Sequence, residues 1–87
     1  MIQYKASYRG SDGTVLAEVL DFPGAVSFGA TLDEARTALA GALQDLAEAL
    51  ILEGKALPVP DPAKSSPESD VEEAIVLDLR ARALAVA

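Results

Sequence analysis

The sequence predicts a small α+β domain, a two-layer sandwich in which one long helix lies on an antiparallel sheet in the order β-β-β-α-β. Three observations predict it. Residues 1–29 hold three apolar strand-like segments separated by turn residues, residues 31–53 carry a helical apolar repeat, and alternation resumes over 71–82 after a proline-rich linker at 55–70. Strands followed by a single long helix are typical of α+β folds, and 87 residues suffice for one domain.

The first three strands are predicted from alternation and from the turns between them. Ile2, Tyr4, Ala6 and Tyr8 alternate with polar residues, and TVLAEVL repeats this pattern after the turn RGSDGT, so these two segments should form a hairpin. The corner DFPG ends the second strand. The short apolar run AVSF then predicts a third strand, which stops at Gly29.

The helix has a defined start and an apolar stripe. Thr31 opens the sequence TLDE with Glu34 three residues later, which is the pattern of a capping box, and Gly54 is a natural stop. We interpret Gly41, inside the helix, as a point of close approach to the sheet. The apolar side chains recur at spacings of three and four: Leu32, Ala35, Leu39, Leu43, Leu46 and Leu50.

Four of the chain's five prolines lie in KALPVPDPAKSSPESD, which predicts an extended and exposed linker. The following VEEAIVLDLRAR alternates and predicts the fourth strand. This strand either returns to the sheet after a long crossover or pairs with another copy of the chain. The terminal RARALAVA fits a strand continuation and a short helix equally well.

The sequence offers no catalytic, cofactor-binding or metal-binding set. It has no cysteine and no histidine, which excludes zinc fingers, thiol nucleophiles and disulfides and removes the commonest general base. The acidic pair at Asp33 and Glu34 is explained by helix capping, and Glu72 and Glu73 should point to opposite faces of a strand. Lys5 is interpreted as a surface lysine on the polar face of its strand. We therefore expect a protein that is not an enzyme and needs no cofactor.

The predicted order also resembles part of the ribonuclease H fold, whose enzymes hold two metal ions between carboxylates of the first strand and the first helix. The first strand here, residues 1–8, has no Asp or Glu. We therefore take the resemblance as architectural and keep a metal-dependent hydrolase only as a third hypothesis, which predicts a magnesium-dependent activity.

Charge indicates the kind of partner. The formal net charge is −7, and the cationic residues are scattered, which argues against direct binding of nucleic acid. An acidic surface suits a basic protein partner, although it equally serves solubility alone. A domain of this size buries only about 60% of its unfolded surface, so a homo-oligomer (dimer or tetramer) is expected. No signal-peptide pattern or membrane-spanning run occurs, so we expect a cytoplasmic protein with no membrane partner.

Residues 13–62 resemble the HicB-like antitoxin family. The family pattern runs from a glycine-containing hairpin turn through an acidic D-x-P-G corner, a short strand ending in Gly and a Thr before "EA", to a long helix and a tail with P-x-P. Here the hairpin glycine is Gly13 and the P-x-P is Leu57 to Pro60. The remaining motif residues are Asp21, Pro23, Gly24, Gly29, Thr31 and Glu34.

The resemblance implies a non-catalytic protein that neutralises a small basic HicA-type toxin, an mRNA-cleaving enzyme, by covering its RNA-binding and catalytic surface. It also implies a partial ribonuclease H-like fold. Many family members carry a C-terminal DNA-binding segment. This chain ends at Ala87 without room for one, which casts doubt on autoregulation through DNA. Ala25 and Ala30 also depart from the family, which often has Cys and a polar residue there.

The hypothesis is thus an antitoxin-like binding module, and the alternative is an orphan homo-oligomer with a structural or regulatory role and no toxin. For the first, residues 55–80 are the predicted contact segment, because an extended acidic linker and a strand edge suit a partner. A solvated loop and an intramolecular strand explain the same residues equally well. The candidate contacts are Pro58, Pro60, Asp61, Glu72, Val76 and Asp78.

Overall fold

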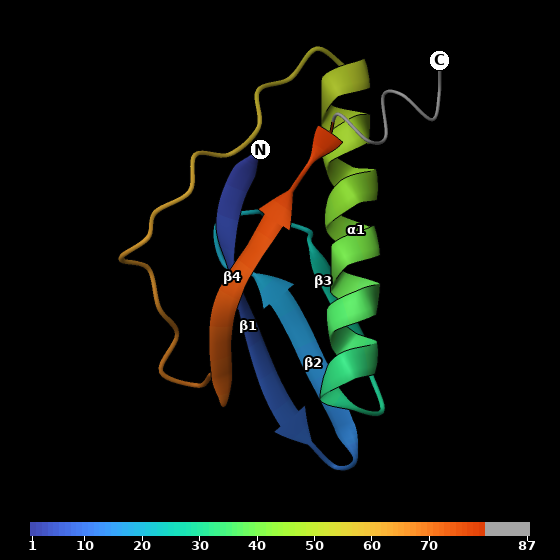
Figure 1. Cartoon of the computed structure of the whole chain (residues 1–87), viewed down its shortest axis with the longest axis vertical. Coiled ribbons are helices and arrows are strands. Elements are labelled where there is room, and N and C mark those ends of the chain that lie inside the picture. Colours follow the sequence, from blue (N-terminus) through green and yellow to red (C-terminus); the bar gives the residue numbers. More distant parts are fainter. Residues whose placement is uncertain (80–87) are drawn as a thin grey trace.

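The computed structural model describes residues 1–79 of the chain. It contains five elements in the predicted order, which confirms the α+β class (Figure 1). They are β1 (Ile2–Ser11), β2 (Thr14–Val19), β3 (Val26–Gly29), α1 (Leu32–Leu52) and β4 (Val71–Leu77).

The four strands form one antiparallel sheet in the order β3-β2-β1-β4. Asp12 and Gly13 join β1 to β2 with φ values of 51° and 79°, as a two-residue hairpin of this twist requires. β4 returns to the sheet beside β1, from Ile2 opposite Leu77 to Tyr8 opposite Val71. The intramolecular pairing is therefore the one observed.

The fourth strand is shorter than the predicted 71–82. It ends at Leu77 because Leu77 pairs with Ile2, the first residue of β1, and the sheet offers no neighbour beyond that point. Asp78 and Leu79 follow outside the strand. Residues 80–82, and with them the whole of RARALAVA (residues 80–87), lie outside the described residues.

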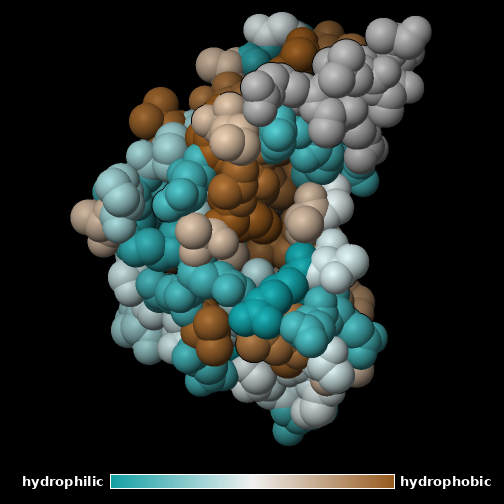
Figure 2. Space-filling view, in the orientation of Figure 1, coloured by the Kyte–Doolittle hydropathy of each residue, from teal (hydrophilic) through white to brown (hydrophobic). Residues whose placement is uncertain are grey.

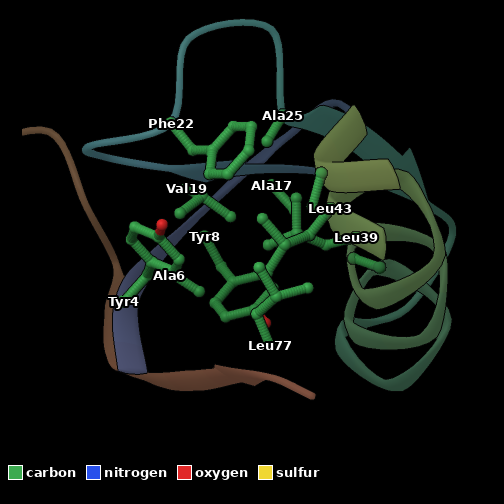
Figure 3. Packing of buried hydrophobic residues seen from close by; sticks show 12 residues of the cluster. Tyr4, Ala6, Tyr8, Ala17, Val19, Phe22, Ala25, Leu39, Leu43 and Leu77 are labelled. Carbon is green, nitrogen blue, oxygen red and sulfur yellow. The ribbon is translucent and has the colours of Figure 1, made fainter. Parts of the chain in front are cut away.

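The two faces of the sheet differ. Residues that stand opposite each other on neighbouring strands point to the same face of the sheet. The helix α1 covers the face that carries Tyr4, Ala6 and Tyr8, and it packs chiefly over β3 and β2 and only lightly on β4. The strand residues that alternate with these, such as Ser7 and Arg9 of β1, point to the opposite face of the sheet, which we call the open face. Figure 3 shows the helix-side core, where the ring of Phe22 lies near Tyr4 and Val19. The buried apolar core is Tyr4, Ala6, Tyr8, Ala17, Val19, Phe22, Ala25, Ala35, Leu39, Leu43, Ala47 and Leu77.

The predicted helical stripe faces the sheet, with Leu39 and Leu43 fully buried. The interpretation of Gly41 is wrong. It lies between these two positions on the solvent side of α1, and a Cβ there would meet no atom within 4 Å. The close approach occurs instead at Gly29, where a Cβ would lie 2.6 Å from the backbone nitrogen of Ala35.

Candidate partner-binding surface

The corner after β2 is built by local backbone hydrogen bonds. Phe22 to Ala25 form a tight turn, with the Ala25 N–H donating to the Phe22 carbonyl at 3.0 Å. Pro23 sets its φ, and Gly24 takes a φ of 90°, as the third residue of a type II turn must. Asp21 precedes this turn, and its side chain is only 9% exposed.

The carboxylate of Asp21 holds a segment 40 residues further along the chain. Its Oδ2 accepts a hydrogen bond from the Asp61 N–H at 2.7 Å, and its Oδ1 lies 3.5 Å from Nζ of Lys64. We call residues 57–70 the strap. Figure 1 shows the chain between α1 and β4 running along the side of the sheet away from the helix. The acidic residue of the D-x-P-G corner is therefore an anchor for the strap as well as part of a turn.

Two side chains of β1 hold the first half of the strap by its carbonyl groups. The hydroxyl of Tyr4 donates to the Pro58 carbonyl at 2.7 Å. The ammonium group of Lys5 donates to the carbonyls of Pro62 at 2.9 Å and Lys64 at 2.7 Å. Burial raises the pKa of Tyr4, and the negative charge of Asp21 raises it further. Prolines lack an N–H, so this half of the strap is held by side chains instead of a strand ladder.

The second half of the strap is held by two polar side chains and one backbone N–H of β1. Arg9 forms an ion pair with Glu68, the hydroxyls of Ser7 and Ser69 are hydrogen-bonded, and the Gly10 N–H donates to Asp70 at 2.8 Å. The strap is thus tied to β1 along its whole length. The linker is extended and largely exposed, as the sequence predicts, and it is also anchored to the sheet, which the sequence did not predict.

Glu72 joins the strap to β4. Its carboxylate accepts hydrogen bonds from the Ser66 N–H at 2.9 Å and the Ser65 hydroxyl at 3.0 Å. The Ser66 N–H is the largest cause that lowers the pKa of Glu72, and the nearby charge of Lys5 also contributes. A carboxylate that accepts such hydrogen bonds is stabilised in its charged form.

A groove of about 550 Å³ lies between the strap and the open face. Its two charged open-face groups already bond to the strap, Lys5 to two carbonyls and Glu72 to Ser65 and Ser66. The groove therefore does not present a ready acid–base pair. Within residues 1–79, no group of three or more acidic side chains is arranged to hold a metal ion. The groove is lined by Gln3, Tyr4, Lys5, Pro60, Asp61, Pro62, Glu72, Glu73 and Ala74.

The structure brings some of the predicted contact residues together and separates others. Pro60, Asp61 and Glu72 line the groove, and Pro58 is held next to it through its carbonyl. Val76 lies further along the open face with 51% of its surface exposed. Asp78 follows β4 beside the helix, where its carbonyl accepts a hydrogen bond from Gln44 at 3.4 Å.

An apolar patch on the open face was not predicted as a contact. Phe28 is 69% exposed and stands opposite Leu16 (37%), next to Val26 (49%). The sequence contained a signal for it. Since Ala17 and Val19 face the core, the alternation of β2 places Leu16 on the outer face, where a polar residue is usual. We call Leu16, Val26 and Phe28 the open-face patch.

The described helix is not apolar enough to cross a membrane. No protein-family model matches the sequence, and no curated protein matches it. Solved structures do match. The N-terminal domain of the antitoxin HicB from Burkholderia pseudomallei is 25% identical with a TM-score of 0.76, and the match covers 90% of this chain and all of that one.

Two further structures show the same fold. The whole Burkholderia pseudomallei antitoxin HicB is 25% identical with a TM-score of 0.78, and the match covers 92% of this chain and 64% of that one. A chain of the HicA3 and HicB3 toxin–antitoxin complex is 21% identical with a TM-score of 0.69, and the match covers 88% of this chain and 99% of that one. The resemblance that residues 13–62 indicate is therefore confirmed by the structure, and the described part of the chain has the fold of a HicB antitoxin N-terminal domain.

Proposed function

We propose that the chain is the antitoxin-type binding module of a toxin–antitoxin pair and that it neutralises a small basic HicA-type toxin in the cytoplasm by non-catalytic binding. The observation that carries the proposal is the match to the HicB N-terminal domain, which extends over the whole of that domain. The match to a chain from a toxin–antitoxin complex supports the same role.

The electrostatics of the chain support a basic partner. With a net charge of −7, the chain attracts cationic proteins and accelerates their association. Within residues 1–79, every cationic side chain already contacts a carboxylate or a carbonyl oxygen of the chain, so little positive charge is left to repel such a partner. These side chains are Lys5, Arg9, Arg36, Lys55 and Lys64.

We place the toxin contact on the open face. The open-face patch lies there beside the exposed carboxylate of Glu18, which stands opposite Val26. An aromatic and apolar centre with a charged rim is the usual composition of a protein interface. The strap residues Pro60 and Asp61 extend this surface, so part of the predicted contact segment is kept in the proposal.

The test needs the chain and the product of a neighbouring reading frame that encodes a small basic protein. We expect the two to co-purify and the chain to restore growth of cells that express the toxin. Phe28→Ser should weaken binding at least about tenfold, since exposed aromatic residues often dominate an interface.

The matched control is Leu52→Ser, which removes an apolar side chain that is even more exposed (87% against 69% for Phe28) at the end of α1, away from the open face. Equal losses in both variants would place the contact elsewhere. Failure of the basic neighbour to bind the unmodified chain would overturn the antitoxin function and favour the orphan homo-oligomer.

A further inference from the structure

We propose that two copies of this chain associate through the outer edge of β4, which joins their sheets into one continuous antiparallel sheet about a two-fold axis at Ala74. This proposal concerns self-association and does not depend on the toxin-binding function.

The outer edge of β4 carries unpaired backbone groups. In β1, the carbonyl of Lys5 accepts a hydrogen bond from the Leu20 N–H on the β2 side, and the carbonyl of Tyr8 accepts one from the Asp70 N–H on the β4 side. Because backbone groups alternate along a strand, the odd-numbered residues of β1 bond towards β2 and the even-numbered ones towards β4. In β4 the partners of these even-numbered residues are Val71, Glu73, Ile75 and Leu77. The backbone N–H and C=O groups of Glu72, Ala74 and Val76 therefore point outward, and among residues 1–79 none pairs with another strand.

Apolar surface accompanies this edge. β4 lies towards the viewer in Figure 1, and in the same orientation Figure 2 shows an apolar strip between β4 and α1. The strip arises because α1 packs over β3 and β2 and only lightly on β4, which leaves Ile75 partly buried. On the open face of the same strand, Val76 is 51% exposed. A seven-residue edge with these neighbours is suited to pairing with another strand.

With a two-fold axis at Ala74, the sequence of β4 places no two carboxylates directly opposite each other. With the axis at Ala74, the small alanine side chains meet at the centre, Glu72 stands opposite Val76 of the second copy, and Glu73 opposite its Ile75. Each of the three outward residues then exchanges two hydrogen bonds with its opposite residue. A register centred on Glu72 would instead place two carboxylates directly opposite each other, which is destabilising.

The charged groups of this edge do not require a basic strand from another protein. The carboxylate of Glu73 already accepts from Arg36 at 2.7 Å, and that of Glu72 already accepts from Ser66. Neither carboxylate needs a cation from a partner. In the dimer both helices lie on one side of the joined sheet and flank the apolar strip, while both open faces stay accessible to a toxin.

Disulfide trapping tests the register, because the chain has no cysteine of its own. The two Cα atoms at position 74 would be about 5.5 Å apart, which a disulfide can bridge. Ala74→Cys should therefore give a covalent dimer under mild oxidation. The matched control is Val76→Cys on the same edge, whose two copies would stand about 14 Å apart and should stay unlinked. Equal cross-linking of both variants would contradict the register.

Light scattering of the chain alone tests the association. We expect a dimer whose dissociation constant rises at least about tenfold in Ala74→Pro, since proline removes an outward N–H and no hydrogen bond within the sheet. Circular dichroism should show that this variant stays folded. A chain that remains monomeric at about 1 mM, or a dimer that Ala74→Pro leaves intact, would overturn the proposal. Because no toxin is present, either result leaves the antitoxin function untouched.

Discussion

Replacing Gly29 and Gly41 by alanine, one at a time, adds the same methyl group at two positions with opposite surroundings. At Gly29 the new Cβ would lie 2.6 Å from the backbone nitrogen of Ala35 and 2.8 Å from Cβ of Glu34. These atoms belong to the first turn of α1, so β3 and the helix must move apart. At Gly41 the new Cβ would point into solvent with no atom within 4 Å.

The two substitutions should change stability in opposite directions. Forcing a methyl group into a packed contact costs about 1–3 kcal/mol of unfolding free energy. Alanine in an exposed helix interior is about 0.8–1.0 kcal/mol more favourable than glycine. The unfolding free energies of the two variants should therefore differ by about 2–4 kcal/mol, although the chemical change is identical.

Thermal unfolding followed by circular dichroism measures this difference. For a domain of this size 1 kcal/mol shifts Tm by about 4–8 °C, so Gly41→Ala should melt several degrees above the unmodified chain and Gly29→Ala several degrees below it. A Gly29→Ala variant as stable as the parent would refute the close contact between β3 and the start of the helix. A destabilised Gly41→Ala variant would refute its exposure.

Three further predictions concern the helix start and the titrating groups. Thr31→Ala should lower the unfolding free energy by about 1 kcal/mol, because the Thr31 hydroxyl accepts a hydrogen bond from the Glu34 N–H at 3.1 Å. Urea unfolding measures this loss, and the control Thr31→Ser, which keeps the hydroxyl, should be nearly as stable as the unmodified chain. Burial raises the pKa of both Tyr4 and Tyr8, so their phenolate absorbance at 295 nm should appear at higher pH in the native chain than in urea, and coincident curves would contradict this. The stability from these tyrosines is present below pH 10 and is lost as the pH rises through their raised pKa values. The pKa of Glu72 is lowered, so its contribution to stability is full above about pH 4.5 and is lost as the pH falls through the lowered pKa. Glu72→Gln should therefore flatten the acid part of a plot of unfolding free energy against pH, and an unchanged plot would show that the Glu72 carboxylate does not stabilise the fold.

The order of the elements could be predicted because burial imposes a local period on the sequence. Alternation over β1 and β2 and the three-and-four spacing over α1 follow from which side of each element meets the core. The helix start was equally local, since Thr31 and Glu34 are three residues apart and the N-cap lies at Thr31. The end of β4 was predicted too late because it depends on where β1 begins, which alternation within β4 cannot reveal.

The contacts that build the candidate surface join residues distant in sequence. Lys5 was correctly placed on the face away from Tyr4, but its bonds to the carbonyls of Pro62 and Lys64 depend on the strap crossing that face. The bond between Asp21 and Asp61 has the same origin. No local pattern encodes such pairs, and so the anchoring of the linker to the sheet was not predicted, although its exposure was. The error at Gly41 was avoidable, because the stripe predicted from the sequence includes Leu39 and Leu43, and a helical residue two positions from each of them lies on a different face.

The distribution of strand edges also argues that β4 and the open face have separate tasks. β3 has only four residues and ends at Gly29 against the helix, so it offers a short edge. The strap carries prolines at alternate positions, Pro58, Pro60 and Pro62, which remove every second donor and prevent it from accepting a new strand. β4 has seven residues and neither proline nor lysine, and the carboxylates of its two charged residues, Glu72 and Glu73, are already bonded to Ser66 and Arg36. If edge pairing were harmful to this chain, β4 is where such protection would be expected. The absence of proline and lysine there is what we expect of a strand whose edge is occupied by a second copy, while the open face stays available for a different partner.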